Sequence, residues 1–127
     1  MTTGNFYFDS KLDVDFLKSI YEDDNEHAEM VFEKFMQTIK TQLLELEEYY
    51  HTGDVELFRK KIHKIKPVLS YVGLTKLTAK AETIEKNCLG TTDVNALAEQ
   101  YTEFKNELNE MIPVVENDLN KLKTVTL

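Results

Sequence analysis

Apolar residues recur every three or four positions along most of the 127-residue chain, with polar residues between them. This spacing predicts amphipathic α-helices, because positions three and four apart lie on one face of a helix. No stretch shows a convincing apolar–polar alternation of the kind that is typical of β-strands. The pattern therefore predicts an all-α protein.

Capping residues and glycines divide the pattern into five predicted helices. They are a short helix after Asp13, a helix from about Asn25 to Tyr50, one from Asp54 to Val72, one from Thr75 to just before Gly90, and one from Asp93 to about Leu122. The residues suited to N-capping are Asp13, Asp54, Thr75 and Asp93. Gly53 and Gly73 follow two of the helices, and we expect Gly73 to end its helix in a left-handed conformation.

Short connections join these segments, so consecutive helices are expected to run antiparallel. The predicted fold is an up-down antiparallel four-helix bundle with a short additional N-terminal helix that covers one end. The second and fifth helices are longer than the third and fourth and should project beyond them. The length is typical of one domain, so residues 1–127 are predicted to form a single helical bundle.

The apolar runs are short, and the chain has a single cysteine. No run is long enough to predict a membrane-spanning helix or a signal peptide, so we expect a cytoplasmic protein with no membrane contact. Cys88 cannot form an internal disulfide or a cysteine-based metal site. It lies near the end of an amphipathic helix, where we expect it to pack as a small hydrophobe.

Charge is unevenly distributed along the chain. The 15 Lys and Arg against 23 Asp and Glu give a net charge of -8, which disfavours nucleic acid as a partner. Residues 57–81 nevertheless contain seven of these cations and no carboxylate, so the remainder carries 8 cations against 23 acids. Such a stretch is typical either of a solvated helix face or of a surface that meets an anion.

Motifs of the common nucleotide- and metal-dependent enzymes are absent. The chain has no Gly-rich phosphate loop, no His-Glu-x-x-His and no paired Glu-x-x-His motifs for a di-iron bundle. His27 and His51 lie near opposite ends of one predicted helix, too far apart to share a metal ion, and the helix dipole accounts for a histidine at the position of His51. The sequence therefore predicts no metal or nucleotide site and no enzyme with a small-molecule substrate.

His63 is the residue that points to a chemical role. The apolar stripe of its helix runs from Phe58 to Val72, and His63 lies about 140° from the centre of that stripe. It therefore faces water, with Arg59 one turn before it and Lys66 one turn after it. A neutral imidazole is a nucleophile, and neighbouring cations help to keep it neutral and attract a phosphoryl group.

His63, Lys66 and Gly73 are spaced at zero, plus three and plus ten, with the apolar Ile65 at plus two. This spacing resembles the core motif of the histidine phosphotransfer (HPt) domain of two-component phosphorelays. The helical layout is similar to that family from about residue 12 to residue 108, which is most of the chain. The resemblance implies that the chain relays a phosphoryl group between aspartates of receiver domains through a phosphohistidine at His63.

The resemblance also implies roles for the residues around His63. Lys66 would stabilise the phosphoryl oxygens, and Arg59 is a second candidate for that task. The residues expected to contact the partner are Lys64, Pro67, Val68, Ser70 and Tyr71. The implied partners are response-regulator receiver domains and a hybrid histidine kinase. The Mg²⁺ that the chemistry needs would belong to the receiver, so this chain would bind no cofactor.

Pro67 departs from the family, which usually has Gly at this position. Proline removes the amide that would bond the His63 carbonyl and bends the helix, while its compact ring still leaves room for a partner to dock. The change favours one alternative, an HPt-like module that regulates a receiver or kinase by docking without being phosphorylated. A plain scaffold bundle with a solvated basic face is a further alternative.

A histidine kinase dimerisation domain also presents a histidine on a helical hairpin. Such a domain dimerises and is ordinarily followed by an ATP-binding domain, and this chain has neither the length for one nor an evident second apolar seam. We therefore expect a monomer. The initial Met and the short tail lead us to expect a free-standing protein rather than part of a larger kinase.

Overall fold

A computed structural model describes residues 6–126, and residues 1–5 and 127 lie outside the described residues. Within this range the protein is helical and has no β-strand, so the all-α prediction is confirmed. The elements are α1 (Val14–Tyr21), α2 (Asn25–Thr52), α3 (Val55–Tyr71), α4 (Thr75–Cys88), the 3₁₀ helix η1 (Val94–Leu97) and α5 (Ala98–Val125). The predicted domain range of 1–127 includes the undescribed residues and stays a prediction.

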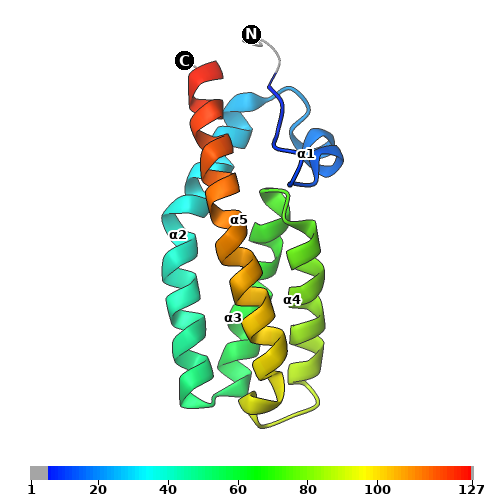
Figure 1. The fold of residues 1–127 in the computed structure, drawn as a ribbon, viewed down its shortest axis with the longest axis vertical. Coiled ribbons are helices and arrows are strands. Elements are labelled where there is room, and N and C mark those ends of the chain that lie inside the picture. The colour runs from blue at the N-terminus through cyan, green and yellow to red at the C-terminus, as the bar shows by residue number, and fades with distance from the viewer. Residues whose placement is uncertain (1–5, 127) are drawn as a thin grey trace.

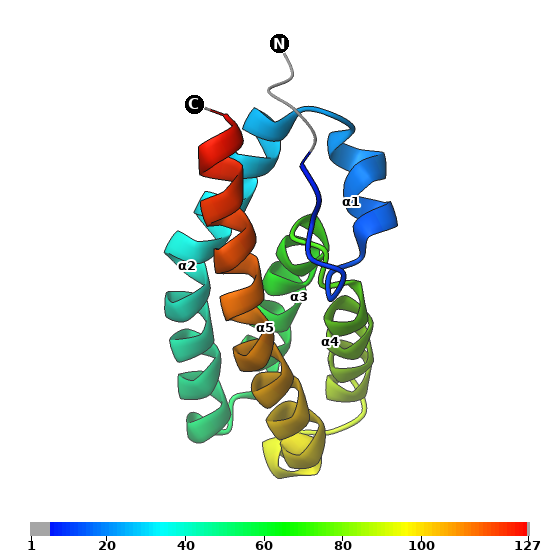
Figure 2. The ribbon, with the colours of Figure 1, turned by 45° about the horizontal axis from the view of Figure 1, so that its top comes forward.

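The four long helices run alternately up and down the long axis of the molecule, as predicted (Figure 1). α2 and α5 have 28 residues each and extend past α3 and α4, which have 17 and 14. The additional length lies at the end of the molecule where α1 is found (Figure 2). The predicted bundle with a short extra helix at one end is therefore confirmed.

Local capping explains why the first three helices begin where they do. Asp13, Asp24 and Asp54 each accept a hydrogen bond from the backbone amide three residues later, at 3.0–3.1 Å. These bonds satisfy amides that have no partner within the helix. The predicted caps at Asp13 and Asp54 are confirmed, whereas Asp24 was not singled out from the sequence.

Gly73 ends α3 in the predicted left-handed conformation, with φ at 82°. The amide of Gly73 donates to the carbonyl of Ser70 and the amide of Leu74 donates to the carbonyl of Leu69, both at 2.9 Å. This pair of bonds is the Schellman arrangement, which satisfies the last carbonyls of a helix and turns the chain. The turn sends α4 back alongside α3.

Two of the predicted caps were wrong in detail. Thr75 is the first residue of α4 and does not cap it, because its hydroxyl donates instead to Asp13 Oδ2 at 2.8 Å. Asp93 caps the 3₁₀ helix η1 through the amide of Asn95, and α5 begins only at Ala98. In the first case a contact 62 residues away in the sequence takes the side chain that a local rule assigns to the helix end.

One hydrophobic core runs through the bundle. The predicted apolar faces supply it, and the largest fully buried side chains include Phe32, Phe35, Phe58, Tyr101 and Phe104. Cys88 is 4% exposed, and burial raises the pKa of its thiol to about 11. Its prediction as a small packed hydrophobe is confirmed.

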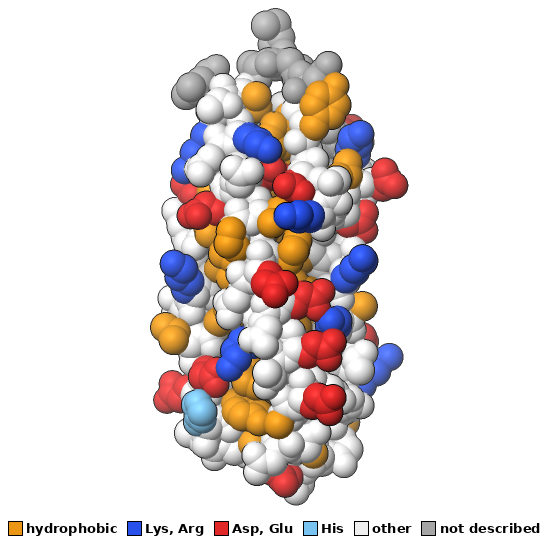
Figure 3. Space-filling view, viewed as in Figure 1, with side chains coloured by type: hydrophobic (Ala, Val, Ile, Leu, Met, Phe, Trp, Pro, Cys, Tyr) orange, Lys and Arg blue, Asp and Glu red, His pale blue; other side chains and the backbone are white. Residues whose placement is uncertain are grey.

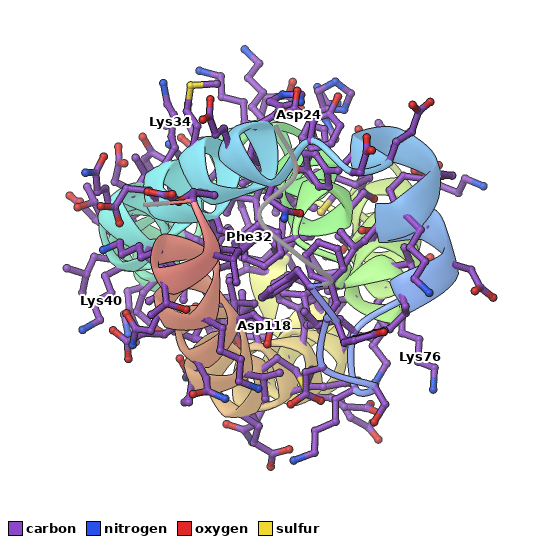
Figure 4. The ribbon with its side chains drawn as sticks, turned by 90° about the horizontal axis from the view of Figure 1, so that it is seen from above. Asp24, Phe32, Lys34, Lys40, Lys76 and Asp118 are labelled. Atoms are coloured by element: carbon purple, nitrogen blue, oxygen red, sulfur yellow. The ribbon has the colours of Figure 1, made fainter. Side chains whose placement is uncertain are left out.

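The segment before α1 is fastened to the rest of the bundle by polar contacts. The amide of Asp9 donates to Asp118 Oδ2 at 2.8 Å, and Asp118 is fully buried on α5. In the view down the bundle, Asp118 and Phe32 point inward, whereas lysines such as Lys34 point outward (Figure 4). The amide of Asp13 donates to the carbonyl of Gly73 at 2.8 Å, so the same segment also holds the α3–α4 turn.

The surface carries charges of both signs. Acidic and basic side chains are interspersed over the face made by α2, α5 and α4 (Figure 3). On this side Lys80 of α4 pairs with Glu103 at 3.3 Å and with Glu107, both on α5. Within residues 6–126, none of the helices is both long enough and apolar enough to cross a membrane.

Candidate functional site

His63 lies midway along α3 and faces solvent, as the helical arithmetic predicts. Its side chain is 64% exposed, whereas Phe58, Ile62 and Ile65 of the same helix are 0% exposed. The apolar stripe fixes the rotation of α3 against the core, and this rotation turns the imidazole outward. His63 is therefore accessible to a partner without any movement of the fold.

Glu85 of α4 contacts the imidazole ring from the side. Its Oε2 lies 2.7 Å from His63 Nδ1, and its side chain is only 16% exposed. An ionised carboxylate can only accept hydrogen bonds, so the contact places the proton of the neutral ring on Nδ1. The lone pair of a neutral His63 is then on Nε2, the nitrogen that Glu85 does not contact.

Lys66 is held by the same carboxylate and by a second one. Its Nζ donates to Glu85 Oε1 at 2.8 Å and also to Glu82 Oε2. Its hydrogen bonds to Glu82 and then Glu85 raise the pKa of Lys66. The hydrogen bond from Lys66 lowers the pKa of Glu82. Hydrogen bonds from Lys66 and, to a smaller extent, from His63 lower the pKa of Glu85. Both carboxyl groups are therefore ionised at neutral pH.

These contacts follow the register of the α3–α4 hairpin around Leu74. Ser70 and Thr78 lie four residues before and after Leu74, and their hydroxyl oxygens are 2.8 Å apart. Lys66 and Glu82 lie eight residues before and after Leu74. His63 and Glu85 lie eleven residues before and after it. Positions equidistant from a tight turn face each other in an antiparallel pair, and this rule identifies the two glutamates.

Neither Glu82 nor Glu85 was singled out from the sequence, although the equal spacing about the turn could have identified both. Residues 57–81 contain no carboxylate, so the stretch looks uncompensated when it is considered alone. In the fold, α4 brings two carboxylates to Lys66, and α2 brings Glu45 to within 3.4 Å of Lys61 Nζ. The surroundings of His63 therefore include carboxylates of α4 as well as the cations of α3.

Arg59, the second predicted phosphoryl-binding cation, is engaged on its own helix. Its Nη2 and Nε donate to the two carboxylate oxygens of Glu56 at 2.5 and 3.2 Å. The hydrogen bonds that Arg59 donates to Glu56 raise the pKa of Arg59. Lys64 differs from Arg59, since it is exposed and forms no ion pair with any described residue.

The residues predicted to contact a partner differ in their exposure. Lys64, Pro67 and Tyr71 are exposed, and Tyr71 is 50% exposed. Val68 packs against the core and is half-buried, and Ser70 is half-buried against Thr78. Pro67 lies on the His63 side of α3, which continues through it without a break in helical structure from residue 55 to residue 71. The exposed set extends from His63 toward the α3–α4 turn.

A shallow groove lies on the other side of His63, between α2 and α3. Tyr49 and the exposed Leu57 supply its apolar surface, and Lys60 and Lys64 are among the cations at its edge. The ring of His63 therefore stands between two different surroundings. Carboxylates of α4 lie on one side, and a groove with apolar and cationic side chains lies on the other.

The other two histidines lie on α2 rather than on α3. His51, at the end of α2, is 72% exposed and places Nε2 3.2 Å from Glu47 Oε2. His27 is exposed in the first turn of α2 and its ring packs edge-on against Tyr21. Nowhere in residues 6–126 do three or more His, Cys, Asp or Glu residues lie close enough together to hold a metal ion.

The structure is thus an all-helical bundle that displays a histidine midway along one helix, with a lysine and two glutamates beside it. Residues 30–119, more than two thirds of the chain, match the family model described as Hpt domain. The protein therefore belongs to the Hpt domain family. Hpt domains are phosphocarrier modules of two-component signalling that interact with receiver domains and kinases. Searches of curated proteins and of solved structures found no significant match.

Proposed function

We propose that this protein relays a phosphoryl group between aspartates of receiver domains through a phosphohistidine at His63. The observation that carries the proposal is the 2.7 Å contact between His63 Nδ1 and Glu85 Oε2 on a ring that is 64% exposed. This contact leaves Nε2 as the nucleophile. Membership of the Hpt family supports the class of reaction.

The proposed transfer starts from a neutral ring with its proton on Nδ1. Nε2 attacks the phosphorus of an aspartyl phosphate, the N–P bond forms, and the P–O bond to the aspartate breaks, so the aspartate leaves as a carboxylate. The imidazole ring becomes positively charged and keeps its proton on Nδ1. The Nδ1–H group donates a charge-assisted hydrogen bond to the carboxylate of Glu85. The second transfer is the reverse reaction, with the aspartate of another receiver as nucleophile.

Lys66 is the cation that we assign to the phosphoryl oxygens. Side chains on a helix lean toward its N-terminus, so Lys66, one turn after His63, leans back toward the ring. Arg59 lies one turn before His63, leans away from it and binds Glu56, so its contribution is secondary. The Mg²⁺ of the receiver, rather than a metal on this chain, would neutralise the remaining oxygens.

The proposed docking surface is the exposed side of α3 around His63. Lys64, Pro67 and Tyr71 present one exposed side chain each in successive turns. The buried faces of α2, α3, α4 and α5 already pack against one another in a single chain, which supports action as a monomer. A receiver that approaches this surface reaches Nε2 without displacing a helix.

A panel of receiver domains phosphorylated with acetyl phosphate tests the function. We expect at least one receiver to lose its phosphate to this protein, and the product to carry an acid-labile, base-stable phosphate. His63→Gln should remove the transfer, whereas His51→Gln should leave it intact. His51 is the matched control, because it is also an exposed histidine beside a glutamate. Transfer that persists in His63→Gln would contradict the assignment.

Pro67 supports a second candidate, docking without phosphorylation. It occupies the position one turn after His63 where the family usually has Gly, and it is exposed to a partner. Binding of a receiver that persists in His63→Ala, with no phosphate on the unmodified protein, would favour this candidate. The absence of both binding and transfer across the panel would favour the plain scaffold.

A further inference from the structure

Lys66 and Glu82 form an ion pair one turn away from His63. Lys66 is the proposed phosphoryl-binding cation, yet in the resting protein its ammonium group is already bound by Glu82 and Glu85. Its side chain is only 19% exposed. A phosphoryl group on His63 must therefore share Lys66 with them or take it from them.

The two glutamates have different relations to the histidine. Glu85 contacts both Lys66 and His63, and its contact with the ring supports the positive charge that forms on phosphorylation. Glu82 makes no hydrogen bond or ion pair with His63, and its other partner among residues 6–126 is Lys86, 3.8 Å away. Glu82 is also the more exposed of the two carboxylates, at 45% against 16%. Its effect on the site therefore passes through Lys66.

The charges of the side chains around Lys66 determine whether Glu82 stabilises or destabilises a phosphoryl group on His63. One ammonium group faces two carboxylates, so Lys66, Glu82 and Glu85 together carry a charge of -1 before phosphorylation. A phosphoryl group adds between one and two further negative charges near neutral pH. An ammonium group has three hydrogens to donate, of which Glu82 and Glu85 use two.

We propose that Glu82 is a positioning residue that binds Lys66 in competition with the phosphoryl group on His63. The inference rests on the proposed function, since it concerns the phosphorylated state of the same site. By holding Lys66, Glu82 keeps the phosphohistidine less stable than it would otherwise be. This favours onward transfer of the phosphoryl group to a receiver over its retention on His63.

The ionisation of the phosphoryl group itself reports on this competition. The protein is phosphorylated with phosphoramidate, whose P–N bond breaks with loss of ammonia as the bond to Nε2 forms. A ³¹P NMR titration then gives the ionisation constant of the phosphoryl group on His63. In Glu82→Gln, where Glu85 is the one carboxylate of the pair that still binds Lys66, we expect this constant to rise about two- to fivefold, which is the scale of a solvent-exposed ion pair.

A matched control and a double variant separate this role from a general change of charge. Glu103→Gln removes the same charge from an exposed Lys–Glu pair between α4 and α5 and should leave the constant unchanged. In a Lys66→Met background, Glu82→Gln should have no larger effect than Glu103→Gln does. Far-UV circular dichroism checks that each variant keeps its helix content.

The possible results distinguish the inference from the function on which it rests. A phosphoryl ionisation constant that is equal in the parent and in Glu82→Gln overturns the role of Glu82 while His63 remains the phosphorylated residue. An equal effect with and without Lys66 overturns the route through Lys66. A parent protein that takes no phosphate from phosphoramidate overturns the proposed function and the inference together.

Discussion

His63 Nδ1 and Glu85 Oε2 lie 2.7 Å apart, and they join α3 to α4 across 22 residues of sequence. The other oxygen of the same carboxylate lies 2.8 Å from Lys66 Nζ. A single side chain of α4 thus contacts both the His63 ring and the neighbouring Lys66. The chemistry proposed for α3 therefore depends on how α4 packs against it.

Replacing Glu85 with Gln should slow the phosphorylation of His63. Gln keeps an oxygen that can accept from Nδ1 but has no charge to stabilise the positive ring of the product. We expect the rate of loading by phosphoramidate to fall about fivefold, because a hydrogen bond to a charged group is stronger than a neutral one by about 1 kcal/mol, which corresponds to that factor in rate. ¹⁵N NMR of the ring should show a smaller fraction of the Nδ1–H tautomer. Unchanged loading and tautomer would contradict the role of Glu85.

Gly73 should be far less tolerant of substitution than Gly53, although both have a positive φ, 82° and 77°. A Cβ on Gly73 would lie 2.7 Å from Leu17 Cδ1 and 3.0 Å from Leu12 Cβ, whereas a Cβ on Gly53 would meet nothing within 4 Å. We expect Gly73→Ala to lower the free energy of unfolding by about 2–4 kcal/mol, from backbone strain and overpacking together.

Gly53→Ala is the matched control, because it carries the backbone strain without the clash. It should lower the free energy of unfolding by about 1–2 kcal/mol. Urea denaturation of the two variants measures the difference, which isolates the packing of the N-terminal segment on the α3–α4 turn. Equal losses in the two variants would show that this packing adds nothing to the requirement for glycine.

The helices were predictable from the sequence because their signals are local. The stripe around Phe58 and Ile62 fixes the rotation of α3, and Asp54 and Gly73 fix its ends, so the outward direction of His63 follows from positions within one helix. The partners of His63 are not local. Glu85 lies on another helix, and its contact depends on the turn at Leu74 and on the packing of α3 against α4.

The role of Asp118 was likewise beyond the reach of periodicity. It lies on the buried face of α5, where the pattern predicts an apolar residue. Its partner is the backbone amide of Asp9, in a segment that shows no helical pattern and whose path no spacing rule gives. Backbone donors leave no mark in a sequence, so a buried carboxylate that binds one cannot be distinguished in advance from an exposed one.

Asp118 should make the unfolding free energy depend on pH. Burial raises the pKa of this carboxyl, which is opposed by the hydrogen bond from Asp9 and by Lys121, 3.9 Å away. A raised pKa means that the protonated form favours folding. The contribution is complete below the pKa of Asp in the unfolded chain and is lost as pH rises through the raised pKa of the folded protein.

Asp118→Asn cannot ionise but keeps an oxygen that accepts from the Asp9 amide. Its stability relative to the parent should therefore increase as pH rises from about 4 toward neutrality, the window above the ordinary pKa of Asp. Urea denaturation across this range measures the effect, and Glu116→Gln, an exposed carboxylate of the same helix, should follow the parent. Parallel curves for the parent and Asp118→Asn would contradict the prediction.

Pro67 should affect the approach of a receiver more than the reactivity of His63. The proline ring is exposed one turn after His63, while the 2.7 Å contact that orients the imidazole involves α4 and not Pro67. Pro67→Gly removes the ring from the surface and restores an amide that can bond the His63 carbonyl. Phosphoramidate is too small to need a docking surface, so loading by this donor should stay within about twofold of the parent, a change of less than 0.5 kcal/mol in the barrier.

Transfer from a phosphorylated receiver should respond differently in the same variant. Because the exposed ring occupies the surface that a receiver approaches, the second-order rate constant for transfer should rise by about tenfold in Pro67→Gly, within the range that single interface changes produce in association rates. Pro67→Ala is the matched control for the restored amide, and its methyl group should give a smaller rise. Rapid-quench measurement with one receiver and both variants makes the comparison. Because the two donors share the chemical step and differ in docking, an equal change with phosphoramidate and with the receiver would place the effect of Pro67 on the histidine itself.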